Sequence, residues 1–133
     1  MITVWVNGCF DVLHRGHIEM FEYAKKQGNI LIVGTDTDAR VQEAKGSHRP
    51  VNKLEDRIYL LNAIKYVDKV VSFNTDDELK KHLQDNNINI MVVGSDWQNK
   101  PIVGQEMVPE IHYFARIKDY STTKTLAGGK PNE

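Results

Sequence analysis

The feature that most constrains this chain is a regular alternation of short, continuous apolar runs with segments of helical periodicity. The runs lack the in-and-out alternation of half-exposed strands, which is typical of strands buried on both faces of a sheet. They occupy residues 2–6, 30–33, 67–73, 88–93 and 111–115. The pattern predicts an α/β fold: a Rossmann-like single domain, with helices covering both faces of a five-stranded parallel sheet.

The segments between these runs contain polar residues that can begin helices. Asp36 or Asp38 is expected to cap a second helix, Asp76 or Asp77 a fourth, and Ser121 a last short one. The first helix is expected to end at Gly28, because glycine favours helix ends. A third helix is predicted from residue 54 to 64, where apolar residues recur at helical spacing. In parallel sheets of this kind, ligands bind at the carboxyl ends of the strands.

Size and composition narrow the class of protein. The chain has 133 residues, which fits one domain at 1–127 followed by a frayed tail at 128–133. Lys plus Arg is 17 and Asp plus Glu is 18, so no strong basic field exists to bind nucleic acid. Cys9 is the single cysteine, and no apolar run approaches the ~20 residues of a membrane span. The first residues lack the basic and apolar pattern of a signal peptide, so we expect none. We therefore expect a cytoplasmic protein with no membrane or nucleic-acid partner.

The segment from Gly8 to His17 joins the first predicted strand to the first helix. Glycine there lets the backbone approach a ligand, and the free N–H groups at the helix start form an anion site. His14 and His17 are three residues apart, so on a helical turn both rings face the same way. Gly16 leaves room between them for a phosphate. The spacing therefore indicates a site in which two imidazoles donate to phosphate oxygens.

Other residues of this segment have simpler explanations. Cys9 is expected to be a small buried residue rather than a nucleophile, and Phe10 to be part of the core. Asp11 is expected to orient the loop through hydrogen bonds. The histidine pair has no third metal ligand nearby in the sequence, so we expect no protein-bound metal centre.

The segment matches the G-x-F-D-x-x-H-x-G-H signature of the cytidylyltransferase-like nucleotidylyltransferase superfamily, which the chain resembles over nearly its whole length. A second segment, from Arg116 to Thr123, resembles that family's R-T-x-x-I-S-T-T signature. The resemblance implies an enzyme that transfers a nucleoside monophosphate from a nucleoside triphosphate to a phosphorylated small molecule and releases pyrophosphate. It also implies a homodimer, to which apolar residues around Tyr59, Tyr66 and Phe73 could contribute.

The resemblance assigns roles residue by residue. As catalytic residues it implies His14, His17, Lys45 and Arg116. As nucleotide-binding residues it implies Gly8, Cys9, Phe10, Asp11, Gly16, Gly94, Ser121, Thr122 and Thr123. As substrate-binding residues we assign Asp36, Asp38, Arg57, Asp96 and Trp97. For Arg57 and Lys45, a surface side chain is the alternative. Mg²⁺ is expected on the triphosphate, held mainly by phosphate oxygens and water.

Two subfamilies fit the chain. Its length, residues 94–97 (G-S-D-W) and Arg116 resemble glycerol-3-phosphate cytidylyltransferases. Residues 45–46 (K-G), 49–52 (R-P-V-N) and 102–104 (I-V-G) resemble heptose-1-phosphate adenylyltransferases, which use ATP. We narrowly favour CTP and an acceptor such as glycerol-3-phosphate, because Arg116 and Trp97 lie in segments closer to the predicted site. A non-catalytic nucleotide-binding protein is the alternative from outside the enzymes.

Overall fold

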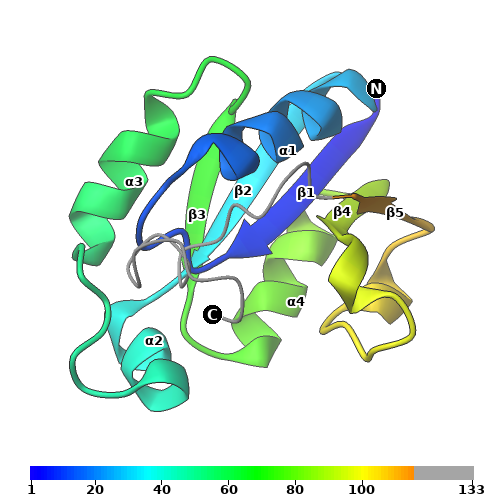
Figure 1. Cartoon of the computed structure of the whole chain (residues 1–133). Helices are drawn as coiled ribbons and strands as arrows, with labels where there is room; N and C mark the ends of the chain where they lie inside the picture. Colours follow the sequence, from blue (N-terminus) through cyan, green and yellow to red (C-terminus); the bar gives the residue numbers. More distant parts are fainter. Residues whose placement is uncertain (116–133) are drawn as a thin grey trace.

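Strands and helices alternate along the chain as the apolar pattern predicts. The computed structural model describes residues 1–115. Its elements are β1 (Thr3–Gly8), α1 (Arg15–Lys26), β2 (Ile30–Asp36), α2 (Asp38–Lys45), α3 (Leu54–Asn62), β3 (Lys69–Phe73), α4 (Asp76–Asp85), β4 (Ile90–Gly94), the 3₁₀ turns η1 (Ser95–Trp97) and η2 (Gln105–Met107), and β5 (Glu110–Phe114). The described strands form a parallel five-stranded sheet in the order β3-β2-β1-β4-β5 (Figure 1). This confirms the predicted fold class.

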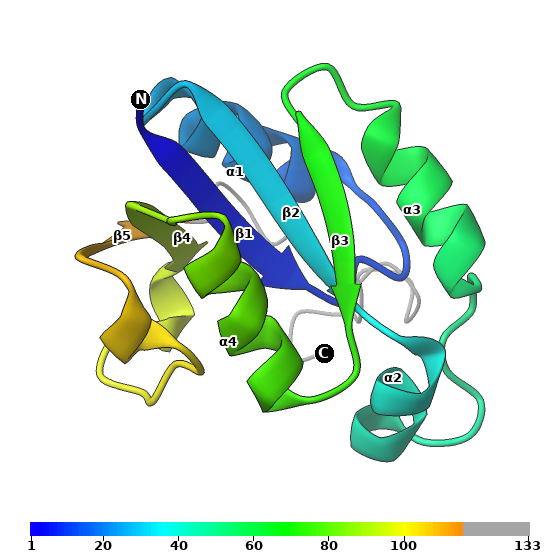
Figure 2. The same cartoon turned by 180° about the vertical axis from the view of Figure 1, so that it is seen from behind.

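Alternate residues of β1 supply the two cores that hold helices on the two faces of the sheet. Val4 and Val6 belong to the cluster that packs under α1 and α3, together with Phe21 and Leu61. Trp5 points the other way, into the cluster that α4 covers. Figures 1 and 2 show these two layers from opposite sides, with α1 over one face and α4 over the other. The central strand is thus buried on both faces, which explains its unbroken apolar run.

The helix ends differ from the prediction. Thr37 and Thr75 cap α2 and α4, and each threonine hydroxyl accepts a hydrogen bond from the backbone N–H three residues ahead. The predicted aspartate caps are therefore wrong; Asp38 and Asp76 lie in the first turns, where their charge favours the helix dipole. Helix α1 ends at Lys26, not at Gly28, whose missing side chain leaves room for Ile2 and Val4.

β1 pairs with β2 on one side and with β4 on the other, and these two pairings, here called seams, differ in length. β1 pairs with β2 at six positions, from Thr3↔Ile30 to Gly8↔Thr35. It pairs with β4 at only two, Val4↔Ile90 and Trp5↔Met91. Beyond them the two strands separate toward their carboxyl ends, at the point where the order of strands reverses. This is the switch point at which parallel α/β sheets bind ligands.

Three predictions lie partly or wholly beyond this description. The boundary at residue 127, the tail and the helix expected after Ser121 fall outside the described residues. Within residues 1–115, no helix is long and apolar enough to cross a membrane.

Candidate active site

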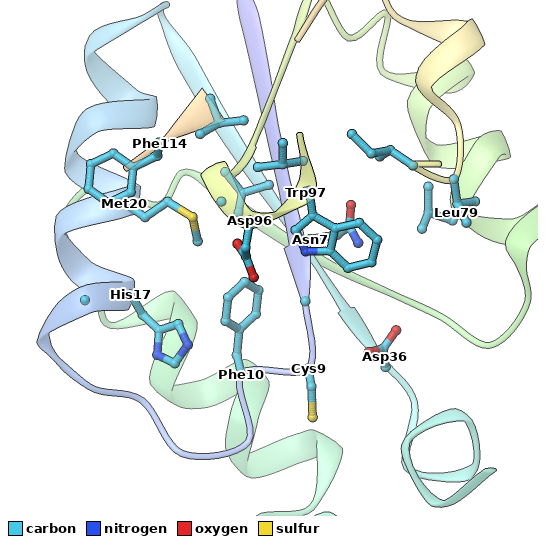
Figure 3. Close-up of a pocket in the computed structure, with 18 of the residues that line it drawn as sticks. Asn7, Cys9, Phe10, His17, Met20, Asp36, Leu79, Asp96, Trp97 and Phe114 are labelled. Atoms are coloured by element: carbon cyan, nitrogen blue, oxygen red, sulfur yellow. The ribbon is translucent and has the colours of Figure 1, made fainter. Parts of the chain in front are cut away.

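A cavity of about 690 Å³ opens where β1 and β4 separate. The ends of both strands line it, with Asn7 and Gly8 on β1 and Val93 and Gly94 on β4. The loop after β1, the start of α1, the end of α2 and the segment after β4 complete its walls (Figure 3). The sequence places a glycine at the end of each flanking strand, and the structure brings both glycines to this one cavity.

His14 and His17 form the N-terminal cap of α1 and also line the cavity. Nδ1 of His14 accepts from the Gly16 N–H at 3.1 Å, and Nδ1 of His17 accepts from the His14 N–H at 3.2 Å. The rings stack with their centroids 3.8 Å apart. Because Nδ1 accepts in both rings, each neutral imidazole carries its proton on Nε2. Both rings are thereby set as Nε2–H donors, which is the arrangement that binding a phosphate needs.

The Phe10 ring packs against the histidine pair through His17. Its ring meets His17 edge-on at 5.4 Å between centroids and also contacts Phe21. A Cβ atom at Gly8 would lie 3.0 Å from the Phe10 ring, so any other residue at this position would press on that ring. Phe10 is buried, as expected of a core residue, and it lines the cavity together with Met20 and Phe114. These three residues give one end of the cavity an apolar wall.

The wall near β2 and α2 carries charge. Asp36, Arg40 and Lys45 line it beside Cys9. Burial raises the pKa of the Cys9 thiol, and the nearby Lys45 charge offsets part of that effect. Burial likewise raises the pKa of Asp36, against the attraction of Arg40, whose Nε lies 3.1 Å from the carboxylate. Lys45 is exposed at the last residue of α2, so its side chain can reach an anion in the cavity.

The wall after β4 combines polar and apolar residues. Asp96 and Trp97 of η1 line the cavity, and Trp97 is about half exposed at 47%. Leu79 of α4, together with Ile102 and Val103 from the segment after η1, extends the lining on the face of the sheet that α4 covers. In Figure 3, Asp96 lies toward the Phe10 side and Leu79 lies at the opposite end. The predicted site residues of this segment therefore share one cavity with the histidines.

Asp11 lies behind the cavity wall as a buried anchor. Its carboxylate accepts from the Arg49 Nε and from the backbone N–H groups of Val51 and Asn52, each at 2.8 Å. Burial opposes its ionisation, but these hydrogen bonds and the Arg49 charge together lower the pKa of Asp11. The contacts agree with the expectation that Asp11 orients the loop. No contact with a nucleotide follows from them.

Arg57 takes a position that the sequence did not indicate. Its side chain is fully buried, and its guanidinium donates to the carbonyls of Cys9, Asp36 and Asn52. It also pairs with Asp38 at 2.7 Å. Neither Arg57 nor Asp38 is among the lining residues of the cavity. The geometry makes Arg57 an internal cross-link, with Asp38 as its partner, rather than the surface arginine considered from sequence. Its role as a phosphate ligand stays a prediction.

Several residues that line the cavity were not predicted from the sequence, and four predicted residues lie outside the described part of the chain. The lining also includes Asn7, Met20, Arg40, Leu79 and Phe114. Position at the carboxyl end of the first strand could have indicated Asn7; the others come together only through the packing of α1, α2, α4 and β5. Of the predicted residues, Arg116, Ser121, Thr122 and Thr123 lie outside the described residues.

The described residues contain no group of three histidine, cysteine or acidic side chains arranged to hold a metal ion. Asp36 and Asp96 are the acidic side chains among the described lining residues. This donor set suits a magnesium ion that arrives bound to phosphate oxygens, for which one or two carboxylates are enough.

A crevice at the switch point of a parallel sheet, with two histidines capping the helix after the first strand, defines a Rossmann-like nucleotide-binding domain. Comparison with known proteins gives the family. Residues 5–128 match the family described as cytidylyltransferase-like, and the chain belongs to that family. This confirms the predicted family and the enzyme class, a nucleotidylyltransferase.

Relatives of this chain include proteins named bifunctional protein HldE. That of Sulfurimonas denitrificans is 42% identical over 126 residues, which cover 93% of this chain and 26% of the relative. That of Helicobacter pylori is 40% identical over 123 residues, covering 92% and 26%. The chain thus spans about a quarter of the length of the curated relatives it matches.

Solved structures share the fold. A lipopolysaccharide core biosynthesis protein from Thermoplasma volcanium superposes with a TM-score of 0.68 at 25% identity, over 91% of this chain and 99% of that one. A pantothenate synthetase from Thermus thermophilus gives 0.62 at 17% identity, over 93% and 60%. The second likeness concerns the fold alone.

Proposed function

We propose that this chain transfers an adenylyl group from ATP to a sugar 1-phosphate of the heptose type and releases pyrophosphate. The observation that carries the proposal is the convergence of His14, His17 and Lys45 on one cavity at the switch point of the sheet. Two ring N–H donors and one ammonium group are the cationic and donor chemistry that a triphosphate needs.

The relatives support the adenylyl alternative over the cytidylyl one that the sequence narrowly favoured. The Sulfurimonas and Helicobacter proteins carry the name HldE, which fits the resemblance of residues 45–46, 49–52 and 102–104 to heptose-1-phosphate adenylyltransferases. The Thermoplasma structure, described as a lipopolysaccharide core biosynthesis protein, also favours a sugar acceptor. The preference for CTP and glycerol-3-phosphate rested on Arg116, outside the described residues, and on Trp97.

The chemistry needs positioning more than covalent catalysis. A phosphate oxygen of the acceptor attacks the α-phosphorus in line, the bond from that phosphorus to the bridging oxygen breaks, and pyrophosphate leaves with the electron pair. His14 and His17 donate from Nε2 to the phosphate oxygens as negative charge builds on them. Lys45 holds the α- or β-phosphate from the opposite wall. A Mg²⁺ ion bound to the triphosphate would neutralise part of its charge, with Asp36 or Asp96 as the available carboxylates.

One observation favours the second candidate, a cytidylyltransferase. Gly94, Asp96 and Trp97, which resemble that subfamily's segment, do line the cavity. In either case a homodimer and a cytoplasmic location remain part of the proposal. Of the three residues suggested for the dimer interface, Phe73 is buried in the core and is unsuitable, whereas Tyr59 is 75% exposed.

The test is a matrix of ATP and CTP against heptose-1-phosphate and glycerol-3-phosphate, with pyrophosphate release as the measurement. Turnover with ATP and the sugar phosphate is expected to exceed that of the other three pairs. Faster turnover with CTP and glycerol-3-phosphate would establish the second candidate instead. Nucleotide binding without pyrophosphate release in any pair would identify a non-catalytic binding protein.

A further inference from the structure

The loop after α2 is fastened to the loop after β1 by one buried carboxylate. Asp11 is 0% exposed in its side chain and accepts from Arg49 Nε, from Val51 N–H and from Asn52 N–H. The Asn52 side chain returns a hydrogen bond, from Nδ2 to the backbone oxygen of Asp11 at 2.6 Å. Four hydrogen bonds thus join two segments that are about forty residues apart in the sequence.

Both fastened segments continue into the cavity wall. Asp11 lies three residues before His14, the N-cap of α1, and Arg49 lies four residues after Lys45, which ends α2. The backbone between Lys45 and Arg49 closes a tight turn, in which the Arg49 N–H donates to the Gly46 carbonyl. Any movement of residues 49–52 is therefore transmitted over a short stretch to Lys45.

Arg49 is poorly explained by stability alone. Its side chain is 12% exposed, and its Nη2 is buried without a hydrogen-bond partner among the described residues. An unsatisfied buried donor is unfavourable, and a smaller residue would avoid it. What the arginine supplies is a charged donor that reaches the Asp11 carboxylate from the neighbouring loop.

We propose that Arg49 is a positioning residue: through Asp11 it locks the loop that follows α2 against the loop that precedes α1. The lock fixes the distance between Lys45 and the histidine pair across the cavity. This inference rests on the proposed function, in which those three side chains grip the triphosphate from opposite walls. It gives a physical role to residues 49–52, the segment whose sequence resembles the adenylyltransferases.

A double-mutant cycle tests the proposal. Turnover of ATP with the sugar phosphate is measured for Arg49→Gln, Lys45→Ala and the double variant, with Lys81→Gln, an exposed lysine of α4, as the control. A misplaced catalytic group costs up to about 10²-fold in rate, so Arg49→Gln should lower kcat by about tenfold or more. The double variant should be no slower than Lys45→Ala alone, because Arg49 acts through Lys45. Arg49→Lys, which keeps a charged donor, should recover part of the rate.

If the two losses multiply instead, Arg49 does not act through Lys45 and the proposal is wrong. Wild-type turnover in Lys45→Ala would also overturn it, while leaving nucleotidyl transfer itself intact. If the wild-type protein transfers nothing with any substrate pair, the proposed function fails separately. The same cycle is then measured on the Kd for ATP, where the same non-additivity is expected.

Hydrogen exchange gives a readout that does not depend on activity. In Arg49→Gln the amides of Val51 and Asn52, which donate to Asp11, should exchange faster, while those at the centre of α4 stay unchanged. Unchanged exchange at Val51 and Asn52 would show that Arg49 does not hold the loop. Faster exchange throughout the protein would show a general loss of stability, which also contradicts the proposal.

Discussion

The two seams that flank β1 are built from the same kind of strand and do opposite things. On the β2 side, pairing runs the full length of β1, and the chain beyond it is cross-linked by Arg57 and Asp11. On the β4 side, pairing stops after two positions and a cavity follows. The comparison shows that the two sides of β1 differ in role: the pairing with β2 holds the loops in place, and the separation from β4 leaves room for a ligand.

The difference has a clear chemical basis. At the carboxyl end of the paired seam, the buried Arg57 guanidinium donates hydrogen bonds to three backbone carbonyls of the protein itself. The separated seam ends in side chains that extend toward the cavity, including His17, Asp96 and Trp97. Substitution of Arg57 beside the first seam should therefore mainly change stability, whereas substitution of the cavity residues beside the second seam should mainly change activity.

The largest effect is expected for Arg57→Ala. Removing the fully buried guanidinium leaves the carbonyl oxygens of Cys9, Asp36 and Asn52 without their donor, and each buried polar group left unsatisfied costs about 1–3 kcal/mol, so the free energy of unfolding should fall by about 3 kcal/mol or more. Urea denaturation followed by circular dichroism measures it. The control is Arg15→Ala, since Arg15 is 72% exposed in its side chain and its pair with Glu19 contributes little. Equal stabilities of the two variants would refute the division between the seams.

His17→Ala should do the opposite of Arg57→Ala: it should lower turnover strongly and stability only slightly. Loss of one donor that stabilises developing charge costs about 10²–10³-fold in turnover. Stability should fall by only about 1 kcal/mol, the typical cost of a lost helix cap. Pyrophosphate release and urea denaturation are measured on the same preparation. Near wild-type turnover would remove His17 from the catalytic residues.

The pH dependence of the free energy of unfolding should reveal how much the ionised Asp11 carboxylate contributes to stability. Its pKa in the folded protein lies below the ordinary carboxyl value, so its contribution to stability is full above that ordinary value and is lost as the pH falls through the lower one. Asp11→Asn should flatten the acid side of the stability profile, whereas Asp85→Asn, at an exposed position on α4, should leave it as it is. Parallel profiles for wild type and Asp11→Asn would contradict the buried anchor.

The smallest effect concerns Cys9, which lines the cavity next to the paired seam. Burial raises the pKa of its thiol, so at neutral pH it should be alkylated slowly by iodoacetamide. ATP at ten times its Kd should slow the alkylation by roughly another tenfold, because only the free protein reacts. Mass spectrometry follows the modification. Alkylation that is indifferent to ATP would place the nucleotide away from Cys9.

Sequence reasoning succeeded where a physical signal is local. Buried parallel strands leave continuous apolar runs, and the motif around His14 and His17 combines a strand end with a helix start, so the sheet and the histidine pair could be predicted. It failed where the answer depends on distant partners. Arg57 resembles a surface arginine until Cys9, Asp36 and Asn52 surround it. The cavity residues Met20, Leu79 and Phe114 come from three elements whose packing no local pattern reports.

One consequence follows from the way α1 begins. The same Nδ1 atoms that cap the helix fix the tautomers of His14 and His17, so the same hydrogen bonds hold the first turn of the backbone and the two rings together. A ligand that pulls on either ring pulls on the amides of Gly16 and His14 as well. Binding of an anion at either ring is therefore expected to disturb the first turn of α1 as well.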